Sequence, residues 1–414
     1  MPTFVGHDRT TSALPGKNVL VLVENLSVPF DRRVWQECEA LRDGGYGVSV
    51  VCPRGSGRDE AEFERLNGVE IHRYPLRPAN GGVLGYGREY AAALWRTWRL
   101  IRRLAKTRRF DVVHACNPPD LLFLPALALR RAGAVFVFDH HDLVPELYLS
   151  RFGRGRDLGY RLTRLLERVA FTLADVVIAT NGSYRRLAIE RGGVSPENVF
   201  VVRSAPDTSL FQQTRSSPQL RKGKRHLLVY LGVMGPQDGV DHALRALAEL
   251  RRRREDWHAV FVGAGDVFHA MRQLCEELGL DDHVDFPGRV PNEELLRILS
   301  TADVALAPDP KNPLNDVSTM NKILEYMALG VPIVSYDLAE ARVSAGDAAV
   351  YATPNDPTAF ASAIDKLLAA PQERSAMAAI GRRRIAGVLG WEHSRRTLME
   401  AYSYATTLRA SPDS

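Results

Sequence analysis

Short runs of consecutive apolar residues alternate with segments of helical spacing along the first half of the chain. Such runs are typical of strands that are buried on both faces of a sheet. They occur at residues 18–24, 47–52, 111–115, 134–138, 175–179 and 199–202. Helical spacing marks residues 31–43, which Gly44-Gly45 ends, and residues 120–131. The alternation predicts a parallel sheet with helices on both faces.

A polar stretch at residues 206–224 interrupts this rhythm, and the rhythm then restarts. The second half predicts strands at 226–231, 257–262, 284–286, 304–307, 331–334 and 349–351, with helices at 240–254, 267–278, 357–370, 372–388 and 391–408. We therefore predict an α/β fold of two Rossmann-like, doubly wound domains that face each other across a cleft. The expected boundaries are a disordered lead at 1–17, a first domain at 18–205, a linker at 206–224, a second domain at 225–390, and a crossing helix and tail at 391–414.

Composition narrows the class of protein. The 414 residues carry a net charge of +5, but residues 1–205 carry +8 and residues 206–414 carry −3. The basic half favours an anionic partner such as lipid headgroups, whereas no nucleic-acid-binding motif accompanies it. The four cysteines form no CxxC pair, and no apolar run reaches the roughly 20 residues of a membrane span. We expect a cytoplasmic protein.

A glycine-rich loop follows the strand predicted at 226–231. It reads GVMGPQDG, and the amides around Gly232 and Gly235 are candidates to contact a phosphate. An ordinary tight turn is the alternative interpretation. The loop lacks the GxGxxG spacing of a dinucleotide site, and the first strand of the chain is followed by Asn25-Leu26-Ser27 instead. Both features argue against a dehydrogenase.

Residues 309–330 contain the most informative segment of the chain. A Pro-rich loop leads into a helix that we expect to begin near Ser318 or Thr319, because both are good N-cap residues. Lys322 falls in the first turn, where the helix dipole opposes a cation, so it needs an anionic partner such as a diphosphate. Glu325, one turn further, is suited to accept hydrogen bonds from a ribose diol. The alternative is an exposed Lys–Glu pair on an ordinary helix.

At this point the sequence resembles glycosyltransferase family 4, the retaining nucleotide-sugar transferases of the GT-B fold. The similar segments occur in family order at residues 24–41, 138–146, 179–193, 230–246, 286–295 and 318–338. The resemblance implies an acceptor-side first domain, a donor-binding second domain, and a terminal helix around 391–408 that crosses back onto the first domain. It also implies same-face attack, in which the departing diphosphate accepts the acceptor's proton.

The resemblance assigns donor contacts and also shows departures. Glu325 matches the second carboxylate of the family's Glu-x7-Glu motif, whereas the first falls on Val317, next to Asp316. The clamp positions that often hold Arg and Lys in the family are Val233 and Asp238 here.

Lys322 is then the main cation expected for the diphosphate, with amides of Gly232, Gly235, Ser318 and Thr319. Arg289 and Val290 match the nucleobase loop. No DxD-type manganese motif has a supporting strand context, so we expect neither a metal nor another cofactor.

The first domain supplies the other candidates. His141 matches the family's histidine near the reacting sugar, and because strand side chains alternate we expect His140 to face the other way. Structural histidines at a strand end are the alternative. Acceptor-side candidates are Asp142 and Glu146, which are suited to orient His141 or an acceptor hydroxyl, and Arg32 and Arg33, which we expect across the closed cleft from the donor. Asp142 is equally suited to be an N-cap.

A second basic feature lies at residues 88–109. Apolar residues recur there at spacings of three and four, with Arg and Trp between them, so the helix is either a packed core helix or one that docks on an anionic membrane.

Our leading interpretation is transfer of a hexosyl unit from a UDP- or GDP-sugar to a lipid-linked or polysaccharide-precursor acceptor, at the inner face of a membrane. The alternatives are the same chemistry on a soluble acceptor, a nucleotide-sugar epimerase, and a non-catalytic donor-binding protein.

Overall fold

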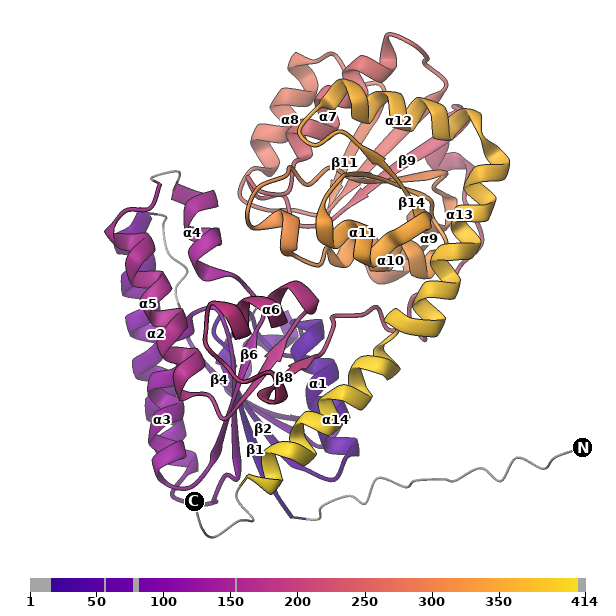
Figure 1. Cartoon of the computed structure of the whole chain (residues 1–414). Helices are drawn as coiled ribbons and strands as arrows, with labels where there is room; N and C mark the ends of the chain where they lie inside the picture. The colour runs from indigo at the N-terminus through magenta and orange to yellow at the C-terminus, as the bar shows by residue number, and fades with distance from the viewer. Residues whose placement is uncertain (1–15, 56, 77–81, 153–154, 409–414) are drawn as a thin grey trace, which may run out of the picture.

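The structure is a computed structural model that describes residues 16–55, 57–76, 82–152 and 155–408. Two α/β domains follow one another along the chain (Figure 1). Most of the expected disordered lead, residues 1–15, and the end of the expected tail, residues 409–414, lie outside the described residues. Among the described helices, none is both long and apolar enough to cross a membrane.

The first domain is built on an eight-stranded sheet in the order β3-β4-β2-β1-β5-β6-β7-β8. All neighbouring strands are parallel except β3 and β4. The strands are β1 (Asn18–Leu22), β2 (Gly47–Pro53), β3 (Phe63–Leu66), β4 (Val69–Tyr74), β5 (Val112–Cys116), β6 (Val135–His140), β7 (Val176–Ala179) and β8 (Val199–Val201). All six runs predicted for this domain begin and end within two residues of the bounds of β1, β2, β5, β6, β7 and β8, because buried apolar strands are the strongest sequence signal of a parallel sheet.

The strands β3 and β4 were not predicted from the sequence. They form an antiparallel hairpin in which Arg65 pairs with Glu70. The turn is Asn67-Gly68, and both residues have positive φ, 49° and 85°. Asn-Gly between alternating residues is the strongest short hairpin signal, so the information was present in the sequence.

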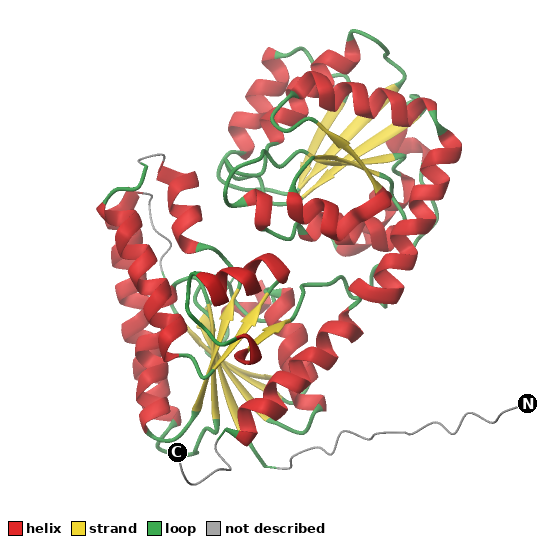
Figure 2. Cartoon of the chain, viewed as in Figure 1, coloured by secondary structure: helices red, strands yellow, loops and turns green. Residues whose placement is uncertain are grey.

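Helices cover both faces of this sheet (Figure 2). They are α1 (Arg32–Asp43), α2 (Gly82–Leu104), α3 (Phe123–Arg131), α4 (Val144–Phe152), α5 (Leu158–Leu173) and α6 (Gly182–Glu190). One face packs on α1 and on the last helix of the chain, and the other packs on α2, α3, α5 and α6. Residues 88–104 of the amphipathic segment predicted at 88–109 belong to α2, which covers one side of the sheet, and the helix ends five residues before the predicted segment does.

The second domain has a six-stranded, fully parallel sheet in the order β11-β10-β9-β12-β13-β14. The strands are β9 (His226–Leu231), β10 (Trp257–Val262), β11 (Val284–Gly288), β12 (Val304–Ala307), β13 (Ile333–Tyr336) and β14 (Ala349–Ala352). The helices of this domain are α7 (Val240–Arg251), α8 (Phe268–Glu277), α9 (Asn292–Thr301), α10 (Asn321–Leu329), α11 (Ala339–Ala345), α12 (Pro357–Ala369) and α13 (Pro371–Arg384), and α14 (Trp391–Thr407) follows them in the chain. The predicted fold class is confirmed.

The helix α14 returns to the first domain, as the fold class implies. A π-helical turn at Ile385–Leu389 separates it from α13. Leu398, Ala401 and Tyr402 of α14 are buried in a core of the first domain, where α14 packs against α1 and β8. The hydroxyl of Tyr402 lies 2.7 Å from Nδ1 of His114 on β5. The end of the chain thus stabilises the domain in which the chain began.

Both sheets change winding direction at their centre. In the first sheet β2 and β4 lie on one side of β1, and the strands from β5 onward lie on its other side. In the second sheet the corresponding neighbours are β9 and β12. Ligands of open α/β sheets bind where two neighbouring strands lead to opposite sides, beyond their carboxyl ends. The fold therefore offers one such position in each domain.

Candidate functional site

A cavity of about 610 Å³ lies between the domains at these two positions, and we call it the central cavity. Its second-domain wall comes from the end of β9 and from the loop and helix that follow β12. That wall consists of Leu231, Gly232, Val233, Gln237, Asp238, Leu314, Asn315, Ser318, Thr319, Met320, Asn321, Lys322 and Glu325. Its first-domain wall consists of Glu24, Asn25, Glu89, Tyr90, Pro118, Asp142, Leu147 and Arg151. The cavity brings both predicted residues of α10 together with the glycine-rich loop.

Lys322 lies in the first turn of α10 and is buried, although it lines the cavity. Its Nζ is 2.6 Å from Oδ1 of Asp309 and 4.9 Å from the ring centre of Tyr230. Burial lowers the pKa of Lys322, but the carboxylates of Asp309 and Asp238 outweigh this effect and raise it. The anionic partner predicted for Lys322 is thus the carboxylate of Asp309 in this structure. The ammonium group of Lys322 stays charged at the edge of the cavity.

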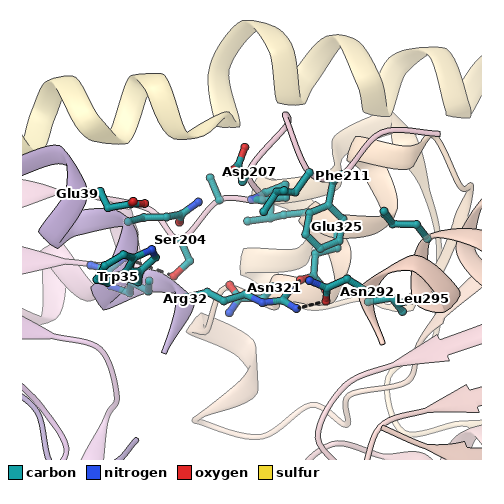
Figure 3. A pocket seen from close by; sticks show the side chains of 17 residues that line it. Arg32, Trp35, Glu39, Ser204, Asp207, Phe211, Asn292, Leu295, Asn321 and Glu325 are labelled. Carbon is teal, nitrogen blue, oxygen red and sulfur yellow. Dashed lines mark hydrogen bonds and ion pairs between the residues drawn. The ribbon is translucent and has the colours of Figure 1, made fainter. Parts of the chain in front are cut away.

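Glu325 lies one turn further along α10, between the central cavity and a second one. This rear cavity has a volume of about 260 Å³, and Figure 3 shows Arg32, Ser204, Asn292 and Glu325 around it. Oε1 of Glu325 is 3.4 Å from Nη1 of Arg32, which comes from the first domain. Burial raises the pKa of Glu325 to about 7, against the opposing charges of Arg32 and Lys322. The carboxylate is therefore poised between its charged and neutral forms near neutral pH.

The start of α10 differs from the prediction. The helix begins at Asn321, and its N-cap is Met320, which makes no side-chain capping bond. Ser318 and Thr319 precede the helix because their hydroxyls are used elsewhere. Ser318 Oγ donates to the carbonyl of Leu314 at 2.7 Å, and Thr319 Oγ1 accepts from Nδ2 of Asn181 at 3.0 Å.

The missing side-chain cap has a chemical consequence. The first amides of α10 receive no side-chain oxygen, which is the condition under which a helix start binds an anionic ligand. Ser318 and Thr319 remain in the wall of the central cavity, beside that helix start.

The glycine-rich loop after β9 passes close to the next strand–helix loop. A Cβ added to Gly263 would lie 1.8 Å from the carbonyl oxygen of Gly232, so this approach requires a glycine. Gly232 lines the cavity as predicted. The amide of Gly235 instead donates to Oδ2 of Asp238 at 2.9 Å, and Gly235 is not in the described wall. One of the two glycine amides is thus used within the loop.

The residues predicted to contact the nucleobase lie apart from the central cavity in this conformation. Arg289 is exposed, stacks on the ring of Phe30 at 5.6 Å, and lines a small neighbouring pocket with Glu24. Val290 packs against the core of the second domain.

The carboxylate of Asp316, next to the missing first Glu of the motif, also lies outside the described wall. It accepts from the amide of Ala339 at 2.9 Å and pairs with Lys311 at 3.4 Å. Asp316 therefore caps the first amide of α11 and lines neither of the two cavities that Glu325 lines.

Glu24 is a site residue that sequence reasoning missed. Glu24 lies just after the end of β1. Burial of its carboxyl group, together with the negative charge of Glu89, raises the pKa of Glu24 to about 8. Its Oε1 has no hydrogen-bond partner among the described residues. At neutral pH such a carboxyl group is able to donate a hydrogen bond into the cavity. The available signal was an acidic residue at the carboxyl end of the first buried strand.

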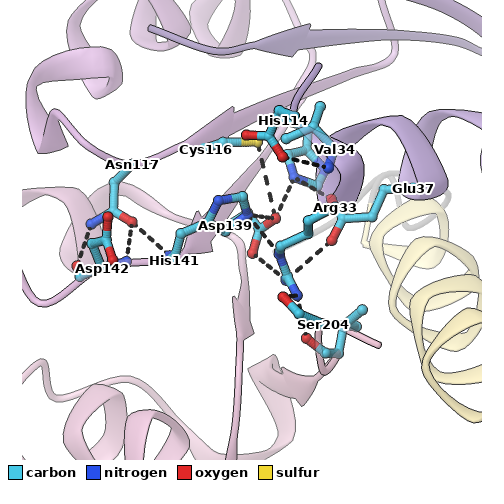
Figure 4. A network of polar contacts seen from close by, with 12 residues as sticks. Arg33, Val34, Glu37, His114, Cys116, Asn117, Asp139, His141, Asp142 and Ser204 are labelled. Atoms are coloured by element: carbon cyan, nitrogen blue, oxygen red, sulfur yellow. Dashed lines mark hydrogen bonds and ion pairs between the residues drawn. The ribbon is translucent and has the colours of Figure 1, made fainter. Parts of the chain in front are cut away.

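His141 joins a buried polar network behind the cavity wall (Figure 4). Its Nε2 lies 2.5 Å from Oδ2 of Asp139 and 2.8 Å from Nε of Arg33. Arg33 also donates to the carbonyl of Val202 at 2.8 Å. The imidazole is therefore fixed by the network, and its predicted contact with the donor sugar stays a prediction. His140 packs on the other side, against Phe171, as expected.

The same network contains four groups spaced closely enough to hold a metal ion. Ligand atoms of Glu37, Cys116, Asp139 and His141 lie within 4.8 Å of one another. The guanidinium of Arg33, however, lies 3.1 Å from Glu37 and 3.0 Å from Asp139. This buried cation already balances the two carboxylates and would repel a divalent ion.

The remaining acceptor-side candidates separate in the structure. Asp142 lines the central cavity, and burial raises its pKa against the opposing charges of His141 and His140. Glu146 lies outside that described wall, because its carboxylate pairs with Arg191 at 2.6 Å and so ties α4 to α6. Arg32 and Arg33 line the rear cavity.

Comparisons with known proteins agree with this architecture. Residues 31–205 match the family model described as a glycosyl transferase 4-like domain, and residues 225–370 match the one described as glycosyl transferases group 1. A relative from Mycolicibacterium hassiacum, an MMP alpha-(1->4)-mannosyltransferase, is 28% identical over 74% of each chain. A GDP-mannose-dependent alpha-(1-6)-phosphatidylinositol monomannoside mannosyltransferase from Mycolicibacterium smegmatis is 33% identical over 45% of this chain and 50% of its own.

A solved structure extends the comparison to three dimensions. The Anabaena protein HepE, in complex with UDP-glucose, superimposes with a TM-score of 0.70 at 17% identity, covering 94% of this chain and 100% of its own. At this identity the likeness shows the fold alone. Because the two family models follow one another in order across both domains, the chain belongs to the family 4-like glycosyltransferases of GT-B type and is a hexosyltransferase.

Proposed function

We propose that the enzyme transfers a hexosyl unit from a UDP- or GDP-sugar, with retention of configuration, to a lipid-linked or polysaccharide-precursor acceptor. We place this reaction in the cytoplasm, at the inner face of a membrane. The observation that carries the proposal is the start of α10. There a charged, buried Lys322 and the carboxyl group of Glu325 line one cavity that meets the strand ends of both sheets.

The donor binds with its diphosphate at the start of α10. The uncapped amides and the ammonium of Lys322 both favour an anion there. The ribose hydroxyls then donate to Glu325, and a buried hydrogen bond to a charged group contributes about 1.5–3 kcal/mol. Lys322 is held in place by Asp309, so the cation is preorganised before the donor arrives.

The transfer step relies on leaving-group stabilisation. Attack of the acceptor hydroxyl forms the new glycosidic bond on the face from which the diphosphate departs, and a diphosphate oxygen takes the hydroxyl proton. Lys322 and the α10 amides stabilise the negative charge that develops on the diphosphate. Glu24 and Asp142 line the opposite wall, where the acceptor binds. We propose that no metal ion takes part.

The printed names of similar proteins support the choice of donor. One relative is named as GDP-mannose-dependent, and the superimposed structure holds UDP-glucose. Val233 and Asp238 lie at the aligned clamp positions, so this chain relies more on Lys322 for the diphosphate than the resemblance alone implies.

Calorimetric titration with UDP and with GDP tests donor binding. We expect one nucleotide to bind the parent enzyme, and Glu325→Gln to weaken it about tenfold or more, as loss of a charge-assisted bond requires. Asp316→Asn is the matched control, since this nearby carboxylate lies outside the described cavity wall and should leave affinity unchanged. Equal affinity of parent and Glu325→Gln would refute the ribose assignment.

Product analysis separates the transferase from the other two interpretations. We expect nucleoside diphosphate release to require an acceptor, and the anomeric proton of the product to show the donor's configuration by NMR. Release without acceptor would indicate a hydrolase, and conversion of the donor to an epimeric nucleotide-sugar without net release would indicate an epimerase. Binding with no change in the donor would indicate a donor-binding protein.

A further inference from the structure

A second concave surface lies on the first domain, outside the donor site. This apolar groove, about 340 Å³ in volume, runs between α2, α4 and α5. Its walls include Leu94, Leu121, Val144, Leu162 and Leu166. Polar groups that could orient a sugar or a nucleotide are few in it, with Asp120, Thr163 and Arg151 the main exceptions. A binding site of this composition favours an apolar ligand.

The apolar groove continues into the central cavity. Tyr90 of α2 and Leu147 and Arg151 of α4 line both. A ligand that fills the groove therefore has one end at the acceptor wall of the donor site. Arg151 places a positive charge at this junction. In a ligand whose apolar portion fills the groove and whose acceptor sugar enters the central cavity, an anionic group that links the two would lie at Arg151.

Exposed apolar side chains lie on two of the helices that form the groove, α2 and α5. Of the large hydrophobic residues exposed in the described chain, Trp95 and Trp98 lie on α2, and Leu158, Leu162 and Leu165 lie on α5. Guanidinium groups accompany the tryptophans, since Arg99 lies 5.7 Å from the ring of Trp95 and Arg102 lies 4.5 Å from that of Trp98. Apolar residues interspersed with arginines are typical of a surface that meets anionic lipid.

We propose that the apolar groove binds the hydrocarbon chain of a lipid-linked acceptor, with the phosphate that joins chain and saccharide at Arg151 and the saccharide in the central cavity. This inference rests on the proposed function, because it names the acceptor class of the same site. The occupant is a lipid chain and not an apolar peptide, since the groove leads from an arginine-rich, apolar outer surface directly to the reacting groups.

Calorimetric titration with dodecyl phosphate, kept below its micelle concentration, tests the proposal on the full chain. We expect the parent enzyme to bind dodecyl phosphate, and not to bind ethyl phosphate, which has the same head group without the chain. Leu162→Asp should weaken binding about tenfold or more, because a charge would enter an apolar wall. Leu165→Asp is the matched control: Leu165 is 57% exposed and Leu162 55%, on the same helix, but only Leu162 lines the groove. Arg151→Gln should weaken binding about threefold, as for an exposed ion pair.

Three outcomes would overturn the proposal: unchanged affinity in Leu162→Asp, equal losses in Leu162→Asp and Leu165→Asp, or tighter binding of ethyl phosphate than of dodecyl phosphate. Sedimentation of both variants adds a fourth, since a dimer that dissociates on either substitution would make this face a protein interface. Titration of UDP and GDP in parallel keeps the two hypotheses apart. Nucleotide binding that persists in Leu162→Asp shows a folded donor site, whereas loss of nucleotide binding in the parent would count against the proposed function itself.

Discussion

Replacing Lys322 tests whether this buried cation serves catalysis or only neutralises Asp309. In Lys322→Met the side chain keeps a similar length and loses its charge. Asp309 is then a carboxylate with 1% exposure and no cationic partner. Its Oδ2 already has no hydrogen-bond partner among the described residues. Breaking a buried pair in this way costs about 3–5 kcal/mol of folding free energy.

A second substitution separates stability from activity. In the double variant Lys322→Met/Asp309→Asn the uncompensated charge is gone, and only an unsatisfied amide remains, at a cost of roughly 1–3 kcal/mol. We therefore expect the double variant to regain about 2 kcal/mol of stability. Its kcat/KM should stay about 100-fold below the parent, as for loss of one preorganised charge stabiliser. Lys322→Arg should retain the charge but rescue only part of the activity, because its planar fork is larger.

The assay combines two measurements on each variant. Urea-dependent hydrogen exchange of the β9 and β12 peptides reports the stability of the second domain, and steady-state kinetics reports kcat/KM. If the double variant recovers activity together with stability, Lys322 is a structural partner of Asp309 and the diphosphate is held by other groups.

Three further predictions follow from the site. Nucleotide affinity should fall as pH drops below about 7, because protonation of Glu325 removes the charged acceptor for the ribose hydroxyls. In calorimetry Glu325→Gln should lack this pH dependence. Arg32→Ala should move the midpoint of the affinity change to higher pH, because it removes a positive charge that lowers the pKa of Glu325. His141→Ala should lower kcat far more than nucleotide affinity, and a kcat close to the parent's would mean that the ring only supports Asp139 and Arg33. Activity should survive dialysis against EDTA, whereas loss that manganese reverses would contradict the metal-free mechanism and make Asp238, in the wall of the central cavity, a candidate ligand.

Strands and helices with strong periodicity were predictable from the sequence. Residues 226–231 and 257–262 are strands at the predicted bounds, because buried parallel strands are apolar throughout. The hairpin around Asn67-Gly68 was missed because charged residues interrupt both strands and because β3 is a half-exposed edge strand, so neither strand is a continuous apolar run. The start of α10 was placed two to three residues early, because the hydroxyls of Ser318 and Thr319 bond groups that sequence spacing does not bring near.

The candidate site was predictable in part. Lys322 and Glu325 lie on one helix, so their spacing alone places them together. Glu24 was not predicted, since its role depends on which strand ends face each other across the domains. The environment of His141 was not predicted either, because Arg33 reaches it from a helix 108 residues earlier in the chain.

The most direct test of sugar transfer is the fate of an isotopically labelled hexose. UDP- and GDP-hexoses carrying ¹³C in the sugar would be incubated with the enzyme and a membrane extract, and lipid-extractable and water-soluble products analysed by mass spectrometry. The account predicts that one labelled hexose appears on a lipid-extractable product, in step with nucleoside diphosphate release, and that Glu325→Gln abolishes both. Label found only on water-soluble products, or nucleotide released with no labelled product, would contradict it.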